Sequence, residues 1–239
     1  MAKPILYSGT RNASSWAMRA WLALRAANVG FVEEVVDIRR PQRFRELARM
    51  SLFSPSASVP ALIVEQAVLF DSLAIMEFAN EAASGALLPG DDLARGQARS
   101  ILAWQHSGLS GICSRISFES SFYPLKRRLA PDEISECSRL FGYLEKLLST
   151  HDGPYLFGAA SLADFALAPT VVRLSRHQPP MASFPATERW MDLVISHPLV
   201  IEWLSEADSL PPVWLEDYLI PGEPASEAFA AIVDKVGHD

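Results

Sequence analysis

The sequence predicts a small α/β domain followed by an all-helical domain. Short apolar runs alternate with helical patterns through about the first 85 residues. A stretch with Pro and Gly, from Leu88 to Asp92, then marks a change in pattern. Beyond it the apolar spacing is helical almost throughout, and no run is as strand-like as those before it.

Four strands and three helices are expected in the first domain. The strands are predicted at residues 5–7, 31–37, 61–64 and 68–70, and the helices at residues 16–27, 39–50 and 72–82. From Trp16, apolar residues recur at i+4, i+7, i+8 and i+11, which places them on one helix face. Gly30 follows and is suited to a left-handed cap. The order β-α-β-α-β-β-α implies one parallel pair with a right-handed crossover and an antiparallel hairpin in the same sheet.

Helices alone are expected in the second domain. They are predicted at about residues 93–122, 131–149, 161–176, 187–196 and 198–205. From Leu210 onward the chain is Pro-rich and acidic, and we expect a tail that lies over the surface. The predicted division is therefore residues 1–85 for the α/β domain and residues 93–239 for the helical domain with its tail.

Composition narrows the class of protein. The chain has 239 residues, of which 49% are hydrophobic and 21% charged, and a net charge of −7, so nucleic acid and anionic membranes are not expected as partners. No window reaches the roughly 18 apolar residues of a membrane span, and the N-terminus lacks a secretory pattern. Cys113 and Cys137 show no CxxC spacing, which fits a reducing, cytoplasmic setting. The five histidines are scattered, so no metal site is expected.

The junction of the first strand and first helix carries the first candidate site. Its sequence is Thr10-Arg11-Asn12-Ala13-Ser14-Ser15-Trp16. A helix N-terminus offers free N–H groups and a partial positive charge, so it stabilises an anion. A thiol with a pKa of about 8.5 can be lowered to about 7 or below in such a setting. The alternative is that Asn12, Ser14 or Ser15 only caps the helix.

Two further segments lie at the ends of predicted strands. In Ser58-Val59-Pro60-Ala61, a cis Val59–Pro60 bond would expose the backbone of Val59 to an extended peptide ligand, although trans is the commoner isomer. In Asp71-Ser72, the carboxylate could accept hydrogen bonds from a ligand ammonium. The alternative for Asp71 and Ser72 is a plain helix cap.

Together, these segments in this order resemble the cytosolic glutathione S-transferase family, over about residues 4–205. The resemblance implies a thioredoxin-like N-terminal domain followed by a helical domain. It also implies that Val59 and Pro60 clamp the cysteinyl backbone of glutathione, and that Asp71 and Ser72 hold its γ-glutamyl end. In the helical domain, Ser161-Leu162-Ala163-Asp164 is similar to the structural capping box of the family.

The opening motif resembles the zeta-like and Ser-type bacterial members, with one departure. When Trp16 is matched to the zeta-class Trp, Asn12 occupies the position of the catalytic serine, which leaves maleylacetoacetate isomerase activity in doubt. Related bacterial sequences carry a Ser-Ser-Trp-like segment, so Ser14 is the first choice as thiolate donor, with Ser15 and Asn12 as alternates. Trp104 and His106 are expected in the second-substrate pocket.

The expected activity is that of a glutathione S-transferase in detoxification. Glutathione would be the co-substrate, and its thiolate would attack a small electrophilic or apolar molecule. The resemblance also implies a homodimer. The alternatives are a glutathione-dependent isomerase or peroxidase, or a non-catalytic ligand carrier or scaffold. Because glutathione has two carboxylates, cationic side chains are expected near the site, with Arg11 and the segment Arg39–Arg45 as candidates.

Overall fold

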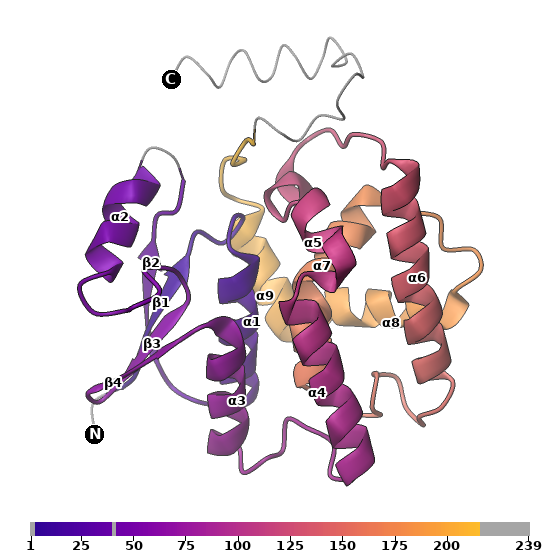
Figure 1. The fold of residues 1–239 in the computed structure, drawn as a ribbon, viewed down its shortest axis with the longest axis horizontal. Coiled ribbons are helices and arrows are strands. Elements are labelled where there is room, and N and C mark those ends of the chain that lie inside the picture. Colours follow the sequence, from indigo (N-terminus) through magenta and orange to yellow (C-terminus); the bar gives the residue numbers. More distant parts are fainter. Residues whose placement is uncertain (1–2, 40–41, 216–239) are drawn as a thin grey trace.

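The computed structural model describes residues 3–39 and 42–215 and confirms the predicted fold class. Its α/β part is a four-stranded mixed sheet with three helices, shown in indigo and purple in Figure 1. The strands are β1 (Ile5–Gly9), β2 (Val32–Val36), β3 (Ala61–Val64) and β4 (Ala67–Phe70), and the helices are α1 (Ser15–Ala26), α2 (Gln42–Met50) and α3 (Ser72–Ala82).

The sheet has the strand order β2-β1-β3-β4. Strand β1 pairs parallel with β2, with Ile5 opposite Val32, and antiparallel with β3, with Ile5 opposite Ile63. Strands β3 and β4 form the predicted hairpin, in which Val64 is opposite Ala67. The parallel pair and the added hairpin therefore agree with the sequence prediction.

The two faces of the sheet pack against different helices. Leu6 and Leu62 belong to the main core with the apolar side chains of α1 and α3. The next residues along the two central strands, Tyr7 and Ala61, point the other way because side chains alternate along a strand, and they pack with Met50 of α2. Figure 1 shows α2 apart from α1 and α3, on the opposite side of the sheet.

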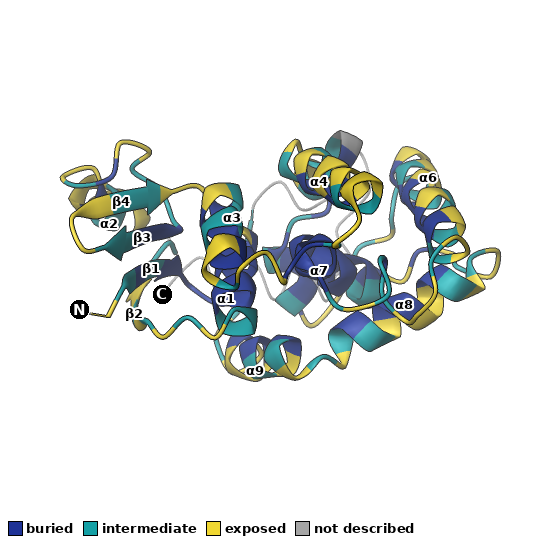
Figure 2. Ribbon diagram, turned by 90° about the horizontal axis from the view of Figure 1, so that it is seen from below, coloured by how far each residue is buried: buried dark blue, intermediate teal, exposed yellow. Residues whose placement is uncertain are grey.

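The second part of the described chain is helical. It contains α4 (Asp92–His106), η1 (Leu109–Gly111), α5 (Ile112–Arg115), η2 (Glu119–Phe122), α6 (Pro131–Leu148), α7 (Leu162–His177), α8 (Pro185–Ile195) and α9 (Pro198–Ala207). Helix α7 is buried along almost its whole length and lies between α1 and helices α6 and α8 (Figure 2). It therefore connects the α/β part to the helical part through one core.

Asp164 fixes the start of α7. One carboxylate oxygen accepts hydrogen bonds from the Ser161 backbone N–H (2.9 Å) and hydroxyl (2.8 Å). The other accepts from the Trp190 indole (2.9 Å) and the Leu156 N–H (3.1 Å). The expected capping residues are thus in contact, and Asp164 is fully used in holding α7 to α8.

Two local predictions are wrong. The single helix expected over residues 93–122 is broken after His106, because Gly108 (φ 91°) and Gly111 (φ 104°) adopt left-handed conformations that end helical turns. The left-handed residue after α1 is Asn28 (φ 54°) rather than Gly30, and asparagine is one of the residues that tolerate this region.

Candidate active site

A cavity of about 1050 Å³ lies where the α/β part meets the helical part. Four parts of its lining come from the α/β part: the start of α1 (13–16), the segment 58–60 before β3, Asp71 with Ser72 at the start of α3, and side chains at and before α2 (Ile38, Arg39, Arg43 and Leu47). The opposite wall comes from α4, α7, the segment 117–119 and residues 212–215. The three segments singled out in the sequence therefore face one cavity.

Ser14 is the N-cap of α1 and is buried in the cavity wall. Its Oγ accepts a hydrogen bond from the N–H of Ala17 (3.2 Å), so the hydroxyl proton remains able to donate to a ligand. The sharp turn from β1 needs Gly9, since a Cβ there would lie 2.6 Å from Ser14 Cβ. Ser14 thus combines a hydroxyl donor with the positive end of a helix.

The two alternates to Ser14 as thiolate donor occupy different positions. Ser15 lines the cavity, and its Oγ accepts a hydrogen bond from Nη2 of Arg173 (3.2 Å). Asn12 is fully buried and is not part of the cavity lining. Its amide nitrogen donates to the carbonyl oxygen of Pro211 (2.8 Å), so it ties the start of α1 to the C-terminal segment instead. Geometry therefore favours the two serines over Asn12 as contacts for a thiolate.

The peptide bond between Val59 and Pro60 is cis. Both residues line the cavity at the start of β3, which pairs with β1 in the middle of the sheet. The backbone of Val59 therefore lies at an edge of the cavity where an extended peptide could run beside it.

Asp71 and Ser72 form the third locus, at the N-terminus of α3. Asp71 has a positive φ of 77°, a region that few non-glycine residues occupy and that is found at functional sites. Its Oδ1 accepts from the N–H of Leu73 (2.8 Å), and its Oδ2 lies 3.4 Å from Nε2 of His106. A ligand at this point meets a carboxylate beside a helix N-terminus, which suits a group that carries both an ammonium and a carboxylate.

The expected cationic residues are only partly at the site. Arg39 and Arg43 line the cavity, and Arg39 already makes a two-point ion pair with Asp37 (2.8 Å for each contact). This pairing holds the pKa of the Asp37 carboxyl below its usual value. Arg11 does not line the cavity: its guanidinium bonds to Glu33 (2.7 Å) and Glu206 (3.0 Å). The expectation for Arg11 is therefore wrong, and its role is structural.

Of the two residues expected in the second-substrate pocket, His106 lines the cavity and Trp104 does not. His106 lines the cavity and stands edge-on to the ring of Trp16, with 5.3 Å between ring centroids. Trp104 is not part of the lining and packs edge-on against Tyr143 of α6, with centroids 5.5 Å apart. The helical period explains this difference, because residues two apart on a helix do not share a face.

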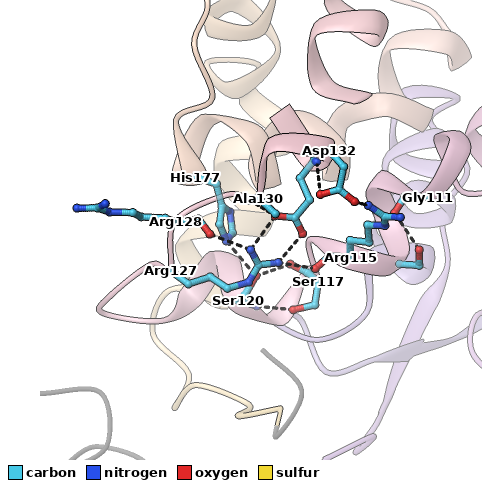
Figure 3. A network of polar contacts seen from close by, with 11 residues as sticks. Gly111, Arg115, Ser117, Ser120, Arg127, Arg128, Ala130, Asp132 and His177 are labelled. Carbon is cyan, nitrogen blue, oxygen red and sulfur yellow. Dashed lines mark hydrogen bonds and ion pairs between the residues drawn. The ribbon is translucent and has the colours of Figure 1, made fainter. Parts of the chain in front are cut away.

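A polar network holds the wall segment 117–122 in place (Figure 3). Arg127 makes a two-point ion pair with Glu133 (2.6 and 2.8 Å) and donates to the carbonyl oxygen of Arg115 (3.1 Å). Nearby, Arg115 pairs with Asp132. These contacts connect the loop after α5 to the start of α6, and they hold the wall segment 117–122 in position between the two helices.

His177 links the same segment to α7 (Figure 3). Its Nδ1 lies 2.8 Å from the carbonyl oxygen of Arg173 and its Nε2 lies 3.1 Å from Ser120 Oγ. Burial lowers the pKa of His177 to about 4, so the ring is neutral at pH 7. Since a carbonyl can only accept, Nδ1 carries the proton of the neutral ring, and the Ser120 hydroxyl lies between Nε2 and the Ser117 carbonyl oxygen (2.8 Å).

Several residues at the cavity were not expected there from the sequence. Arg173 and Cys113 line it from the helical side, beside Phe118. The last described residues, 212–215, also line it, and Tyr123 anchors them through hydrogen bonds to the Val213 carbonyl (2.9 Å) and from the Leu215 N–H (2.8 Å). Arg173 did leave a signal in the sequence, because a cation within the largely apolar run from Phe165 to Leu174 is unusual.

Two other kinds of site were sought in the described part of the chain. Within residues 3–39 and 42–215, no group of three or more His, Cys, Asp or Glu side chains is placed to hold a metal ion. The described helices also include none with the length and apolarity to cross a membrane.

Comparisons with known proteins agree with this geometry. A model of the glutathione S-transferase N-terminal domain matches residues 13–82, and a model of the C-terminal domain of the same family matches residues 129–206. A maleylacetoacetate isomerase of Mus musculus is 30% identical over 77% of this chain and 83% of its own length. A probable maleylacetoacetate isomerase of Caenorhabditis elegans is 28% identical over 83% of this chain and 92% of its own length.

Solved structures show the same fold. The structure of poplar glutathione transferase F1 matches with a TM-score of 0.70 at 16% identity, over 88% of this chain and 100% of that chain. A glutathione transferase homologue from Burkholderia, solved with bound glutathione, matches with a TM-score of 0.65 at 23% identity, over 86% of this chain and 98% of that chain. At these identities the likeness establishes the architecture.

Proposed function

This chain belongs to the glutathione S-transferase family, and from that premise we propose that it binds glutathione in the cavity and activates its thiol. The observation that carries the proposal is the meeting of three segments at one cavity: the N-terminus of α1, the cis Val59–Pro60 bond and the Asp71–Ser72 pair. Each is suited to a different part of glutathione, and they lie far apart in the sequence.

The tripeptide fits this arrangement from end to end. Its γ-glutamyl ammonium meets Asp71, while its α-carboxylate meets the N-terminus of α3 at Ser72. Its cysteinyl backbone pairs with the backbone of Val59. Its glycyl carboxylate reaches the rim of the cavity at Arg43. The cysteinyl sulfur is then directed toward the start of α1.

At the start of α1, Ser14 donates its hydroxyl hydrogen bond to the sulfur, and the helix N-terminus stabilises the negative charge. The thiol proton leaves to solvent, and the thiolate attacks an electrophilic carbon of a small second substrate on the helical side of the cavity. The rate gain comes from thiolate stabilisation and from holding the two reactants together. His106 and Phe118 provide part of the second-substrate wall.

Calorimetric titration of glutathione, with Asp71→Asn as the diagnostic variant, tests this proposal. Asparagine keeps an oxygen for the cap to Leu73 but removes the charge that pairs with the ligand ammonium. Loss of a charge-assisted hydrogen bond should weaken binding by about tenfold to a hundredfold. Asp91→Asn is the matched control, because Asp91 caps α4 in the same way (2.8 Å to the Ala94 N–H) outside the cavity.

Two results would contradict the proposal. If the wild-type chain binds no glutathione at millimolar concentration, the protein is a carrier or scaffold that keeps only the fold. If Asp71→Asn and Asp91→Asn bind glutathione equally well, the γ-glutamyl end is held elsewhere.

A glutathione-dependent isomerase is the second candidate. It is supported by the names of the relatives from Mus musculus and Caenorhabditis elegans, both called maleylacetoacetate isomerase or probable maleylacetoacetate isomerase. In an isomerase the thiolate adds to a double bond and leaves again, so glutathione is regenerated. Measuring glutathione consumption against conversion of a cis-alkene acid distinguishes the two activities. A peroxidase would instead convert glutathione to its disulfide.

The proposal includes the setting of the enzyme. We place it in the cytoplasm as a homodimer acting in detoxification, with domains at residues 1–85 and 93–239. Light scattering at several protein concentrations tests the dimer.

A further inference from the structure

Two buried arginines, Arg173 in the cavity lining and Arg19 of α1, carry guanidinium nitrogens that have no hydrogen-bond partner among the described residues. Arg19 of α1 is 1% exposed and Arg173 of α7 is 4% exposed. Four of their nitrogens are buried without a hydrogen bond: Nη1 and Nη2 of Arg19, and Nε and Nη1 of Arg173. Buried polar groups in native proteins almost always have partners, so these four nitrogens need an explanation.

The two side chains make hydrogen bonds and ring contacts, and among the described residues none of these contacts is with a carboxylate. Arg19 donates from Nε to the carbonyl oxygen of Ala166 (2.9 Å), and its guanidinium lies 4.5 Å from the ring centroid of Trp16. Arg173 donates from Nη2 to Ser15 and lies 5.3 Å from the ring centroid of Phe118. These contacts, like the contact of Arg19 with the Cys113 side chain, involve no carboxylate.

Within the described residues, no carboxylate forms an ion pair with Arg19 or Arg173. The next arginine along α7 shows the usual arrangement, because Arg176 makes a two-point pair with Asp208 (2.7 and 2.9 Å). Among the residues that the structure describes, Arg173 therefore differs from Arg176 in making no ion pair with a carboxylate.

Charge and burial act together on this pair. Burial, with the nearby positive charge of Arg173, lowers the pKa of Arg19 to about 9, and burial also lowers the pKa of Arg173. Cys113 opposes the shift at both sites, as do Asp71 at Arg19 and Glu119 at Arg173, but these groups do not prevent it. An anion placed beside the two guanidinium groups would offset both their burial and their mutual repulsion.

We propose that Arg173, supported by Arg19, is the binding subsite for a carboxylate group on the electrophilic second substrate. The proposal rests on the function proposed above, because glutathione then occupies the other half of the cavity. Arg173 lines the cavity next to Ser15, on the helical side of the start of α1. The carboxylates of glutathione are assigned to Arg43 and to the N-terminus of α3, so they do not need this pair.

The chemistry of the subsite selects a flat organic acid. Guanidinium nitrogens match the two oxygens of a carboxylate, and charge-assisted pairs of this kind are the strong ones. The unpartnered Nη1 and Nη2 form the terminal edge of Arg19. Beside the arginines, the rings of Trp16 and Phe118 line the cavity and supply an apolar surface for a planar carbon skeleton. A carboxylate held here would orient the rest of the acceptor toward Ser14 and the bound thiolate.

Calorimetry with succinate as an unreactive probe tests the subsite directly. Succinate is titrated into the protein with and without saturating S-methylglutathione, and dimethyl succinate serves as the neutral counterpart. The wild-type chain should bind succinate and not the diester. Arg173→Met should weaken succinate binding by about tenfold to a hundredfold, and Arg173→Lys, which keeps the charge, should lie between them. Arg139→Met is the control, because Arg139 pairs with Glu136 (2.7 Å) on α6 and is not part of the lining.

A pair of electrophiles tests whether the subsite acts in the reaction. 4-Chloro-3-nitrobenzoate and 4-chloro-3-nitrobenzamide differ in one charged group. In each, the glutathione thiolate forms a C–S bond to the ring carbon as the C–Cl bond breaks, and chloride leaves with the electron pair. The ratio of kcat/KM for the acid to that for the amide should fall at least about tenfold in Arg173→Met, because only the acid loses a charge-assisted contact.

The outcomes separate this inference from the proposed function. Succinate binding without glutathione binding would leave the subsite standing and refute the transferase. Glutathione binding without succinate binding, with an acid-to-amide ratio unaffected by Arg173→Met, would refute the subsite alone. Equal succinate affinity in Arg173→Met and Arg139→Met would also overturn the proposed subsite. The subsite would likewise be refuted if Arg173→Met weakened the binding of glutathione and not that of succinate, because the two arginines would then bind the tripeptide.

Discussion

Replacing Ser14 with alanine should raise the pKa of bound glutathione and leave the tripeptide bound. The Ser14 hydroxyl accepts from the Ala17 N–H (3.2 Å), so its own proton is available for the sulfur. Removing one hydrogen bond to a charged group costs about 1.5–3 kcal/mol. Because each pKa unit corresponds to about 1.4 kcal/mol, the thiol pKa should rise by roughly 1–2 units. The remaining stabilisation comes from the N-terminus of α1, which the substitution leaves in place.

The same substitution has a separate structural cost. Ser14 is the N-cap of α1, and loss of a serine cap lowers the free energy of unfolding by about 1 kcal/mol. Urea unfolding of the variant measures this cost independently. A variant that is about 1 kcal/mol less stable remains folded, so the thiol measurement can be made on native protein.

The assay is the ultraviolet absorbance of the thiolate of bound glutathione, followed against pH with the protein in excess. Ser15→Ala is the matched control, because Ser15 also lines the cavity and its hydroxyl instead accepts from Arg173. Asn12→Ala tests the remaining alternate. If the pKa in Ser14→Ala equals that of the wild type while Ser15→Ala raises it, the assignment of Ser14 is refuted and Ser15 is the donor.

Three other predictions concern neighbouring parts of the structure. Gly9→Ala should abolish glutathione binding measured by calorimetry while the chain still folds, because the added Cβ would lie 2.6 Å from Ser14 Cβ. The free energy of unfolding should fall by about 2 kcal/mol between pH 7 and 4.5, because His177, with a pKa of about 4 in the folded state, takes up a proton near its usual pKa of 6.5 only on unfolding. Iodoacetamide should modify Cys113, which lines the cavity, and not Cys137, whose pKa burial raises to about 12.

Each of these three has its own control. Gly96→Ala is the counterpart of Gly9→Ala, because a Cβ at Gly96 meets no atom within 4 Å. For the pH dependence, His177→Asn should remove the fall in stability below pH 6.5, and an unchanged slope in that variant would assign the effect to other groups. Alkylation is read by peptide mass spectrometry with and without bound S-methylglutathione. Equal labelling of Cys113 and Cys137 in native protein would contradict the cavity assignment.

Much of the fold could be predicted because each element has a local cause. The period of the apolar residues set α1, and α3 was predicted with the bounds Ser72–Ala82 that the structure has. The long helix predicted over residues 93–122 failed for a local reason as well. The apolar spacing continues past His106, but Gly108 adopts a left-handed conformation that a helix does not contain. The glycine was visible in the sequence, and its conformation was not.

The glutathione side of the cavity was predictable from motifs, and the opposite side was not. Val59 and Pro60 directly precede β3, a strand expected from the sequence, so a short motif fixes their place beside the sheet. The other wall depends on contacts between distant residues. Asn12 bonds to Pro211, 199 positions away, and this contact places the segment 212–215 over the cavity. Arg173 meets Ser15 only because α1 packs against α7. No local pattern encodes such contacts.

The net charge of −7 and a cavity that attracts anions are compatible because they act at different distances. At physiological ionic strength, interactions between exposed charges are largely screened beyond about 8 Å, so the overall charge mainly repels partners with extended anionic surfaces. A small acid that enters the cavity leaves bulk water and meets the charge of Arg173 in a medium of low dielectric constant, where screening is weak. The overall charge therefore argues against a nucleic-acid partner and does not argue against a carboxylate substrate. The position of individual arginines decides between these cases: within residues 3–39 and 42–215, Arg176 pairs with Asp208, whereas Arg173 forms no ion pair with a carboxylate.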